Sequence, residues 1–251
     1  ELGISGAAIA SSLAEMGSLI VLCIYTKAKI DKDKYGLKPV YDGRLLIKVL
    51  NLSVWSMLHA FISVAPWFLF FVAIEHLGKT ELAISNITRS VSAIFFVIAN
   101  SFAVTTGSLV SNVIGAGARN ELFPICHKVL KLGYAVGIPF VVVALLCNRW
   151  IVSFYTDNEL LIELAFAPFV VMILNYTFAL PGYVYLNAVG GTGKNKITFL
   201  FQVTTTCVYL VYLYWLSFCI KASLSLYLTA EYLFVILLAL QSIIYLKSKH
   251  Y

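Results

Sequence analysis

The stretch that decides the fold runs from Leu82 to Asn120 and reads LAISNITRSVSAIFFVIANSFAVTTGSLVSNVIGAGARN. It places an arginine inside an otherwise apolar helix and ends in a glycine-rich turn. At about 100° per residue, four of its polar residues fall within about one third of the helix circumference: Asn86, Arg89, Ser90 and Asn100. The opposite side is apolar and carries Val91, Ile94, Phe95, Ile98 and Phe102. A water-soluble helix shows the reverse proportions, so we expect a membrane span whose apolar side faces lipid and whose polar stripe faces protein or water.

The composition of the whole chain agrees with a membrane location. Hydrophobic residues make up 61% of the sequence and charged residues 12%, which lies outside the range of soluble domains. Apolar runs of about 20 residues predict an all-α polytopic protein with seven transmembrane helices. The expected spans are Ile4 to Tyr25, Val49 to Phe71, Leu82 to Leu109, Val129 to Leu146, Leu160 to Leu186, Ile197 to Phe218 and Leu224 to Leu246.

The distribution of Lys and Arg predicts the orientation of these spans. Connections that would lie on one side carry fourteen basic residues: the segment from Lys27 to Lys48, the segment from Arg119 to Lys131, the turn at Lys194 and the tail. The alternate connections carry only Lys79, Arg149 and Lys221. By the positive-inside rule the first set, including the C-terminus, is cytoplasmic. The net charge of +6 therefore reflects membrane topology and is no evidence for nucleic-acid binding.

The domain organisation follows from one charged linker. The chain opens on Glu1 and enters its first span without the regions of a signal peptide, so we expect it to be the C-terminal portion of a longer protein. Residues 1–26 are then the last helix of one unit, and residues 27–48, which include Gly36 and Pro39, form a cytoplasmic linker. Residues 49–251 form a six-helix unit with short connections.

One face of the second span is polar and predicts a substrate-facing wall. It carries Ser56, His59, Ser63 and Trp67, and we add Asn175 from the fifth span as a binding residue. An aromatic face attracts an organic cation by about 0.5–2 kcal/mol, which makes Trp67 the leading candidate. The alternative is that Trp67 faces lipid or fills the core. His59 is either a hydrogen-bond donor between helices or a proton carrier.

Three charges inside the spans predict a buried charge network: Glu15, Arg89 and Glu231. At about 1.5 Å per residue, Arg89 and Glu231 lie about 12–14 Å from the same membrane surface, whereas Glu15 lies nearer 20 Å from it. Arg89 and Glu231 are therefore expected to pair. Whether such a pair is structural or part of a working site is left open, because both look alike in sequence.

No cofactor and no metal ion is expected. The turn VGGTGKNK, ending at Lys196, strings glycines before a lysine, but a phosphate-binding loop would need glycine at position 188 and Ser or Thr at position 195, where Ala188 and Asn195 stand. The five cysteines show no metal-ligand spacing.

Several blocks together resemble the multidrug and toxic compound extrusion (MATE) transporters, particularly the bacterial ones. These blocks are GISGAAIASSLAE from Gly3, FFVAIEHLGKTELAISNITRS from Phe70, SLVSNVIGAGARNE from Ser108 and AVGGTGKNK from Ala188. The resemblance covers essentially the whole chain. It implies two six-helix lobes that alternate between inward-open and outward-open cavities, with this chain as the last helix of the first lobe, the linker and the complete second lobe.

The resemblance implies a secondary active exporter in the bacterial inner membrane that moves amphiphilic or cationic compounds outward in exchange for protons or sodium. Its partners would be the small-molecule substrate, the coupling ion, the bilayer and the missing N-terminal lobe. The chain departs from the family where some relatives carry cation-binding carboxylates, since Ser63 and Ala179 stand there. Two alternatives remain: a flippase for lipid-linked precursors from the same superfamily, and a membrane scaffold or receptor subunit that transports nothing.

Overall fold

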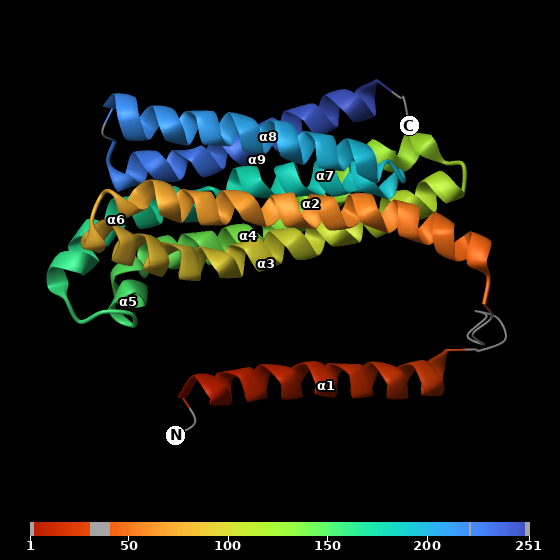
Figure 1. The fold of residues 1–251 in the computed structure, drawn as a ribbon, viewed down its shortest axis with the longest axis horizontal. Coiled ribbons are helices and arrows are strands. Elements are labelled where there is room, and N and C mark those ends of the chain that lie inside the picture. The colour runs from red at the N-terminus through yellow and green to blue at the C-terminus, as the bar shows by residue number, and fades with distance from the viewer. Residues whose placement is uncertain (1–2, 31–40, 221, 249–251) are drawn as a thin grey trace. The chain divides into compact units, whose positions relative to one another are not determined.

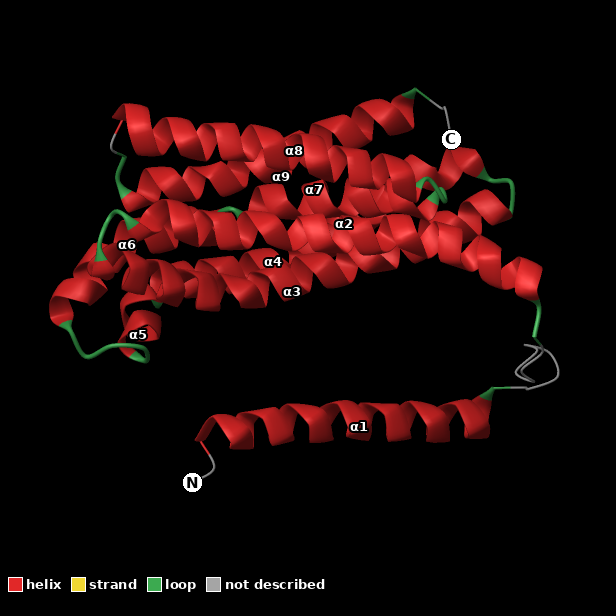
Figure 2. Cartoon of the chain, viewed as in Figure 1, coloured by secondary structure: helices red, strands yellow, loops and turns green. Residues whose placement is uncertain are grey.

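The computed structural model describes residues 3–30, 41–220 and 222–248, and within these residues the regular structure is helical, without a strand (Figure 2). The helices are α1 (Gly3–Lys29), α2 (Gly43–Glu75), α3 (Lys79–Gly115), α4 (Leu122–Leu146), α5 (Asn148–Ser153), α6 (Glu159–Leu174), α7 (Tyr176–Gly191), α8 (Asn195–Trp215) and α9 (Leu224–Lys247). A 3-10 turn, Arg119–Glu121, precedes α4, and a π-helical turn, Leu216–Ile220, follows α8. The all-α prediction is confirmed.

Seven segments of the described chain are long and apolar enough to cross a membrane, as predicted. The fifth of them, Glu159–Gly191, consists of α6 and α7 together. The short α5 was not predicted. It is only six residues long and lies in the connection before α6, where an apolar run of that length carries no spanning signal.

The chain divides into two compact units, Glu1–Val49 and Leu50–Tyr251. The first unit contains α1 and the beginning of α2, and the second contains the rest of α2 and helices α3 to α9. Residues 31–40 of the expected linker lie outside the described residues, so the domain boundaries at residues 26 and 48 stay predictions. The long helices of the second unit run roughly parallel to one another (Figure 1).

Glycines set the distance between the central helices of the second unit. α7 packs closely on both α3 and α9. A Cβ atom on Gly191 would lie 2.5 Å from the Gly107 carbonyl oxygen of α3, and one on Gly182 would lie 2.7 Å from the Val235 carbonyl oxygen of α9. The Ser111 hydroxyl, which donates to the Gly191 carbonyl oxygen at 2.9 Å, reinforces the first crossing. Small residues therefore bring α3 and α9 against opposite parts of α7, as is typical of helix packing in lipid.

The fifth span breaks at Asn175, between α6 and α7. Pro181 lacks the amide that would donate to the Thr177 carbonyl oxygen one turn earlier. The Tyr134 hydroxyl of α4 donates to that oxygen instead, at 2.7 Å. The Tyr232 hydroxyl of α9 likewise donates to the Val171 carbonyl oxygen at the end of α6. Neighbouring tyrosines thus donate to backbone carbonyls on both sides of the break, and the Asn175 side chain at the break is buried.

The prediction that one side of α3 faces lipid is wrong for most of the residues on that side. Val91 and Phe95 are buried, and Phe95 packs its ring against Tyr176 of α7 at 6.0 Å between centroids. Ile98 and Phe102 are partly buried against the same core, and only Ile94 is largely exposed. The error arises because helix–helix interfaces in a membrane are as apolar as lipid-facing surfaces, so apolarity alone does not tell them apart.

Candidate functional site

A cavity of about 460 Å³, called the main cavity below, lies among α2, α3, α6, α7, α8 and α9. Residues from all six helices line it. Those that matter most here are Ser63, Trp67, Arg89, Asn175, Tyr183 and Glu231. The main cavity therefore contains three of the four predicted substrate-binding residues and two of the three predicted charges.

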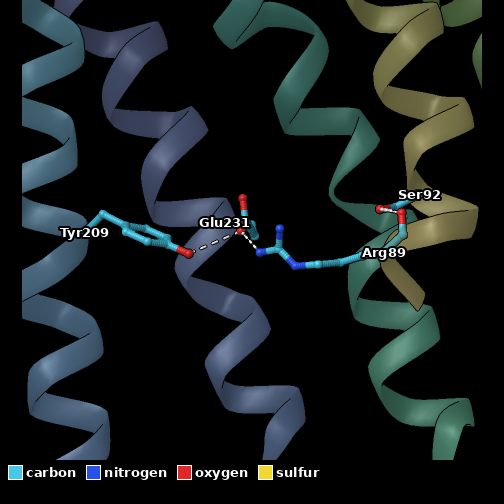
Figure 3. Close-up of polar contacts among 4 residues, drawn as sticks. All are labelled: Arg89, Ser92, Tyr209 and Glu231. Carbon is cyan, nitrogen blue, oxygen red and sulfur yellow. Dashed lines mark hydrogen bonds and ion pairs between the residues drawn. The ribbon is translucent and has the colours of Figure 1, made fainter. Parts of the chain in front are cut away.

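Arg89 and Glu231 form a direct ion pair between α3 and α9. The Arg89 side chain points from α3 toward α9, and its Nη2 donates to Oε1 of Glu231 (Figure 3). Tyr209 of α8 donates its hydroxyl to the same oxygen at 3.2 Å. The side chain of Arg89 is 2% exposed and that of Glu231 is 16% exposed. The carboxylate thus retains some accessible surface while its charge is balanced.

Aromatic rings of α2 cover the guanidinium group of Arg89. Its Cζ atom lies 4.1 Å from the ring centroid of Phe70, 5.2 Å from that of Trp67 and 5.3 Å from that of Phe71. The Nε and Nη1 atoms of Arg89 are buried and have no hydrogen-bond partner in the described part of the chain. The π faces of α2 therefore provide the remaining favourable contacts of this buried cation.

Trp67, Ser63 and Asn175 occupy different environments within the main cavity. Trp67 is 51% exposed, so it has free surface beyond its contact with Arg89. Ser63 donates its hydroxyl to the Ala60 carbonyl oxygen of its own helix at 2.7 Å. Asn175 is buried, and its Oδ1 atom has no hydrogen-bond partner among the described residues. The cavity wall thus offers an aromatic surface and an unused carbonyl acceptor.

Ser56 does not line the main cavity. It lies in a second cavity of about 360 Å³, called the polar cleft below, where the Asn195 amide donates to its hydroxyl at 3.0 Å. Ser56 and Ser63 share a face of α2 but lie about two helical turns apart, which separates them between two cavities. Three residues line both cavities: His59, Leu186 and Asn187.

Sequence reasoning missed the groups that complete the charge network. Tyr209 lies on α8, whose sequence gives no periodic signal for a polar side chain at that depth. Phe70 and Phe71 are part of a continuous apolar run on α2, so their packing against a cation could not be separated from lipid contact. Trp67 and Phe71 are four residues apart and therefore lie on one helix face, and this spacing was the available sequence signal for an aromatic surface on α2.

The positions where the resemblance places carboxylates of some relatives, Ser63 and Ala179, both line the main cavity. Glu231 is the acidic residue among its described lining residues. Glu15 lies in α1, within the first unit, and its membership of the charge network stays a prediction.

These features define a polytopic α-helical membrane protein whose bundle encloses a partly polar, aromatic-walled cavity with an internal ion pair. The family model MatE matches residues 56–216, which is more than half of the chain, and the chain belongs to this family. The resemblance to MATE transporters is thereby confirmed. No curated protein sequence matches the chain.

Two solved structures share the fold. A crystal structure of MATE in complex with MaL6 is 17% identical, covers 99% of this chain and 57% of its own, and superposes with a TM-score of 0.81. A crystal structure of MATE in the bent conformation is 16% identical, covers 78% of this chain and 44% of its own, and superposes with a TM-score of 0.70. This chain therefore spans less than two thirds of either structure.

Proposed function

We propose that this chain is part of a secondary active exporter that moves amphiphilic or cationic compounds out of the cell in exchange for protons or sodium. The observation that carries the proposal is the main cavity, in which the ion pair of Arg89 and Glu231 lies beside the half-exposed ring of Trp67. Family membership supports a transport role, and the cavity supports the substrate class.

The free groups of the main cavity suit an organic cation. Trp67 offers a π face and Glu231 a carboxylate with accessible surface, and Asn175 carries a buried Oδ1 atom without a partner among the described residues. Arg89, in contrast, is 2% exposed and has its charge balanced by Glu231. A bound cation therefore meets acceptors and an aromatic surface, while the one arginine of the wall is shielded from it.

The same charge balance disfavours the flippase alternative. A precursor linked to lipid through phosphates would need exposed cations, whereas Arg89 is buried and paired. The alternative of a membrane scaffold or receptor subunit that transports nothing is also disfavoured, because it gives no role to the main cavity and its unpartnered polar atoms. No covalent chemistry is part of this proposal, because binding and release of an unchanged molecule require none.

The rest of the proposal concerns architecture. We place this chain in the bacterial inner membrane with the C-terminus cytoplasmic, as the last helix of a first lobe followed by a second lobe. Alternating access requires two opposing units, so a further N-terminal lobe completes the transporter. The basic residues Arg119, Lys194 and Lys247 flank the spans on the side that we assign to the cytoplasm.

Efflux of a fluorescent cation from bacteria that express the full-length gene tests this function. We expect faster efflux of ethidium from expressing cells than from cells with an empty vector, and loss of the difference when a protonophore and sodium removal abolish both gradients. The variant Glu159→Gln, which removes an exposed carboxylate outside the main cavity, should transport normally. Equal efflux with and without expression, at verified membrane insertion, would contradict the proposal.

A further inference from the structure

His59 lies in the wall shared by the two cavities. It lines the polar cleft together with Asn195 at the start of α8, and it lines the main cavity together with Glu231 of α9. The other two shared residues, Leu186 and Asn187, belong to α7, so the partition consists of α2 on one side and α7 on the other. A group in this position can contact solvent from one cavity and ligand from the other.

The imidazole of His59 has an unpartnered nitrogen among the described residues. This atom, Nε2, is buried and has no hydrogen-bond partner there. Asn187, its neighbour in the partition, instead donates to the Tyr183 carbonyl oxygen of its own helix at 3.0 Å. An unpartnered nitrogen in the interior is costly, and among the described residues His59 has no partner at this atom that would make it a satisfied donor between helices.

The other titratable groups that line the two cavities are few. Among the described residues they are Arg89 of α3, Glu231 of α9, and Tyr176 and Tyr183 of α7. Of these described residues, none from α8 that lines either cavity is charged, and His59 is the titratable residue of the polar cleft. Arginine stays protonated and a phenol titrates near pH 10, whereas imidazole is the side chain that ordinarily changes charge near neutral pH. Glu231 is already engaged, because it pairs with Arg89 and accepts from the Tyr209 hydroxyl.

We propose that His59 is the proton-binding group of this unit and that its protonation excludes a cationic substrate from the main cavity. A hydronium ion in the polar cleft transfers its proton to the ring nitrogen of His59 that carries no hydrogen, so that an O–H bond breaks and an N–H bond forms. When the substrate enters, that N–H bond breaks and the proton returns to water. The main cavity then changes from neutral to net positive, because Arg89 and Glu231 already cancel. This inference rests on the proposed exchange of cations for protons and assigns the competing proton to one residue.

Competition of this kind is reciprocal. A cation in the main cavity must lower the proton affinity of His59 by the same factor by which a proton on His59 lowers the affinity for the cation. Coupling between two sites in proteins amounts to about 5- to 150-fold in affinity, and we expect a value in this range. Neither cavity needs a second titrating carboxylate for this effect.

Direct observation of the His59 ring is the first experiment. We would label histidine imidazoles with ¹⁵N in the purified full-length protein in lipid nanodiscs, assign His59 by comparison with His59→Gln, and titrate from pH 5 to pH 8. We expect His59 to take up a proton in this range, and 1 mM tetraphenylphosphonium to shift its midpoint to lower pH. A His59 that stays neutral down to pH 5, or a midpoint that a bound cation does not move, would overturn the inference.

Binding of tetraphenylphosphonium across the same pH range is the second experiment. We expect binding to weaken about 5- to 150-fold on acidification in the unmodified chain, to become independent of pH in His59→Gln, and to be weak at every pH in His59→Lys. The matched control His127→Gln changes an exposed histidine at the start of α4 and should keep the pH dependence of the unmodified chain.

The two experiments separate this inference from the proposed function. If tetraphenylphosphonium binding shows the same pH dependence in His59→Gln and in the unmodified protein, the proposed role of His59 is contradicted. The exporter proposal is unaffected by that result. A chain whose His59 titrates but which binds no cation at any pH contradicts the proposed substrate class and leaves proton binding at His59 standing.

Discussion

Replacing Arg89 and Glu231 separately and together gives a sharp test of their pairing. Arg89 is 2% exposed and Glu231 is 16% exposed, so loss of either partner strands a charge in the interior of the second unit. Breaking a buried pair by removing one partner costs about 3–5 kcal/mol, while replacing both partners with apolar residues is often close to neutral. We therefore expect Arg89→Leu and Glu231→Leu each to destabilise the chain by about 3–5 kcal/mol, and the double variant by less than either.

The assay measures two quantities for each purified variant in detergent: the yield of folded protein and the denaturant concentration at the midpoint of unfolding. A matched control is available in the exposed pair of Arg149 and Glu159, whose atoms lie 2.8 Å apart and whose side chains are 76% and 78% exposed. Removing either partner of that pair should change stability by about 0–1 kcal/mol. If the damage in the double variant of Arg89 and Glu231 equalled the sum of the single variants, the pair would make no energetic contribution and our reasoning would be refuted.

Three further predictions concern the cavity, the packing and the completeness of the unit. In the full-length protein, Trp67→Ala should weaken binding of organic cations about 2- to 30-fold, because a cation–π contact contributes about 0.5–2 kcal/mol. The control Phe68→Ala changes an exposed residue of the same helix outside the main cavity and should leave binding unchanged. Unchanged efflux of every tested cation in Trp67→Ala at equal expression would contradict the assignment. Gly191→Ala should lower the stability of the chain in detergent by about 1–3 kcal/mol, since its Cβ would lie 2.5 Å from a carbonyl oxygen of α3. Gly115→Ala, whose Cβ would have nothing within 4 Å, should leave stability unchanged. Equal melting temperatures for these two variants would count against close packing of α3 and α7 at Gly191. The 251-residue chain alone, reconstituted in vesicles, should catalyse no gradient-driven transport, and robust transport by it would show that no second lobe is required.

The number of spans and the pairing of two charges could be predicted from the sequence because both depend on distance along a helix. Runs of about 20 apolar residues mark a span, and a rise of 1.5 Å per residue places Arg89 and Glu231 at matching depth. The structure brings these two side chains together. Depth along the membrane normal is a one-dimensional quantity, which a sequence carries directly.

Rotation about the helix axis was predicted less well. Val91 and Phe95 were expected to face lipid, but both are buried, and Phe95 packs on Tyr176 of α7. An apolar partner helix and lipid demand the same residues. Ser56 was grouped with Ser63 from their common face, but the two line different cavities. The aromatic cover of Arg89 also depends on which helix lies opposite, and that information comes from the packing of the whole unit.

Exchange in reconstituted vesicles tests the central claim most directly. Full-length protein would be placed in liposomes loaded with tetraphenylphosphonium, and release would be followed after a sudden acidification or sodium addition outside, with the membrane potential clamped. We predict that one of the two gradients accelerates release, and that Trp67→Ala reduces the acceleration while Phe68→Ala does not. Release at the rate of protein-free liposomes under both gradients would contradict the account.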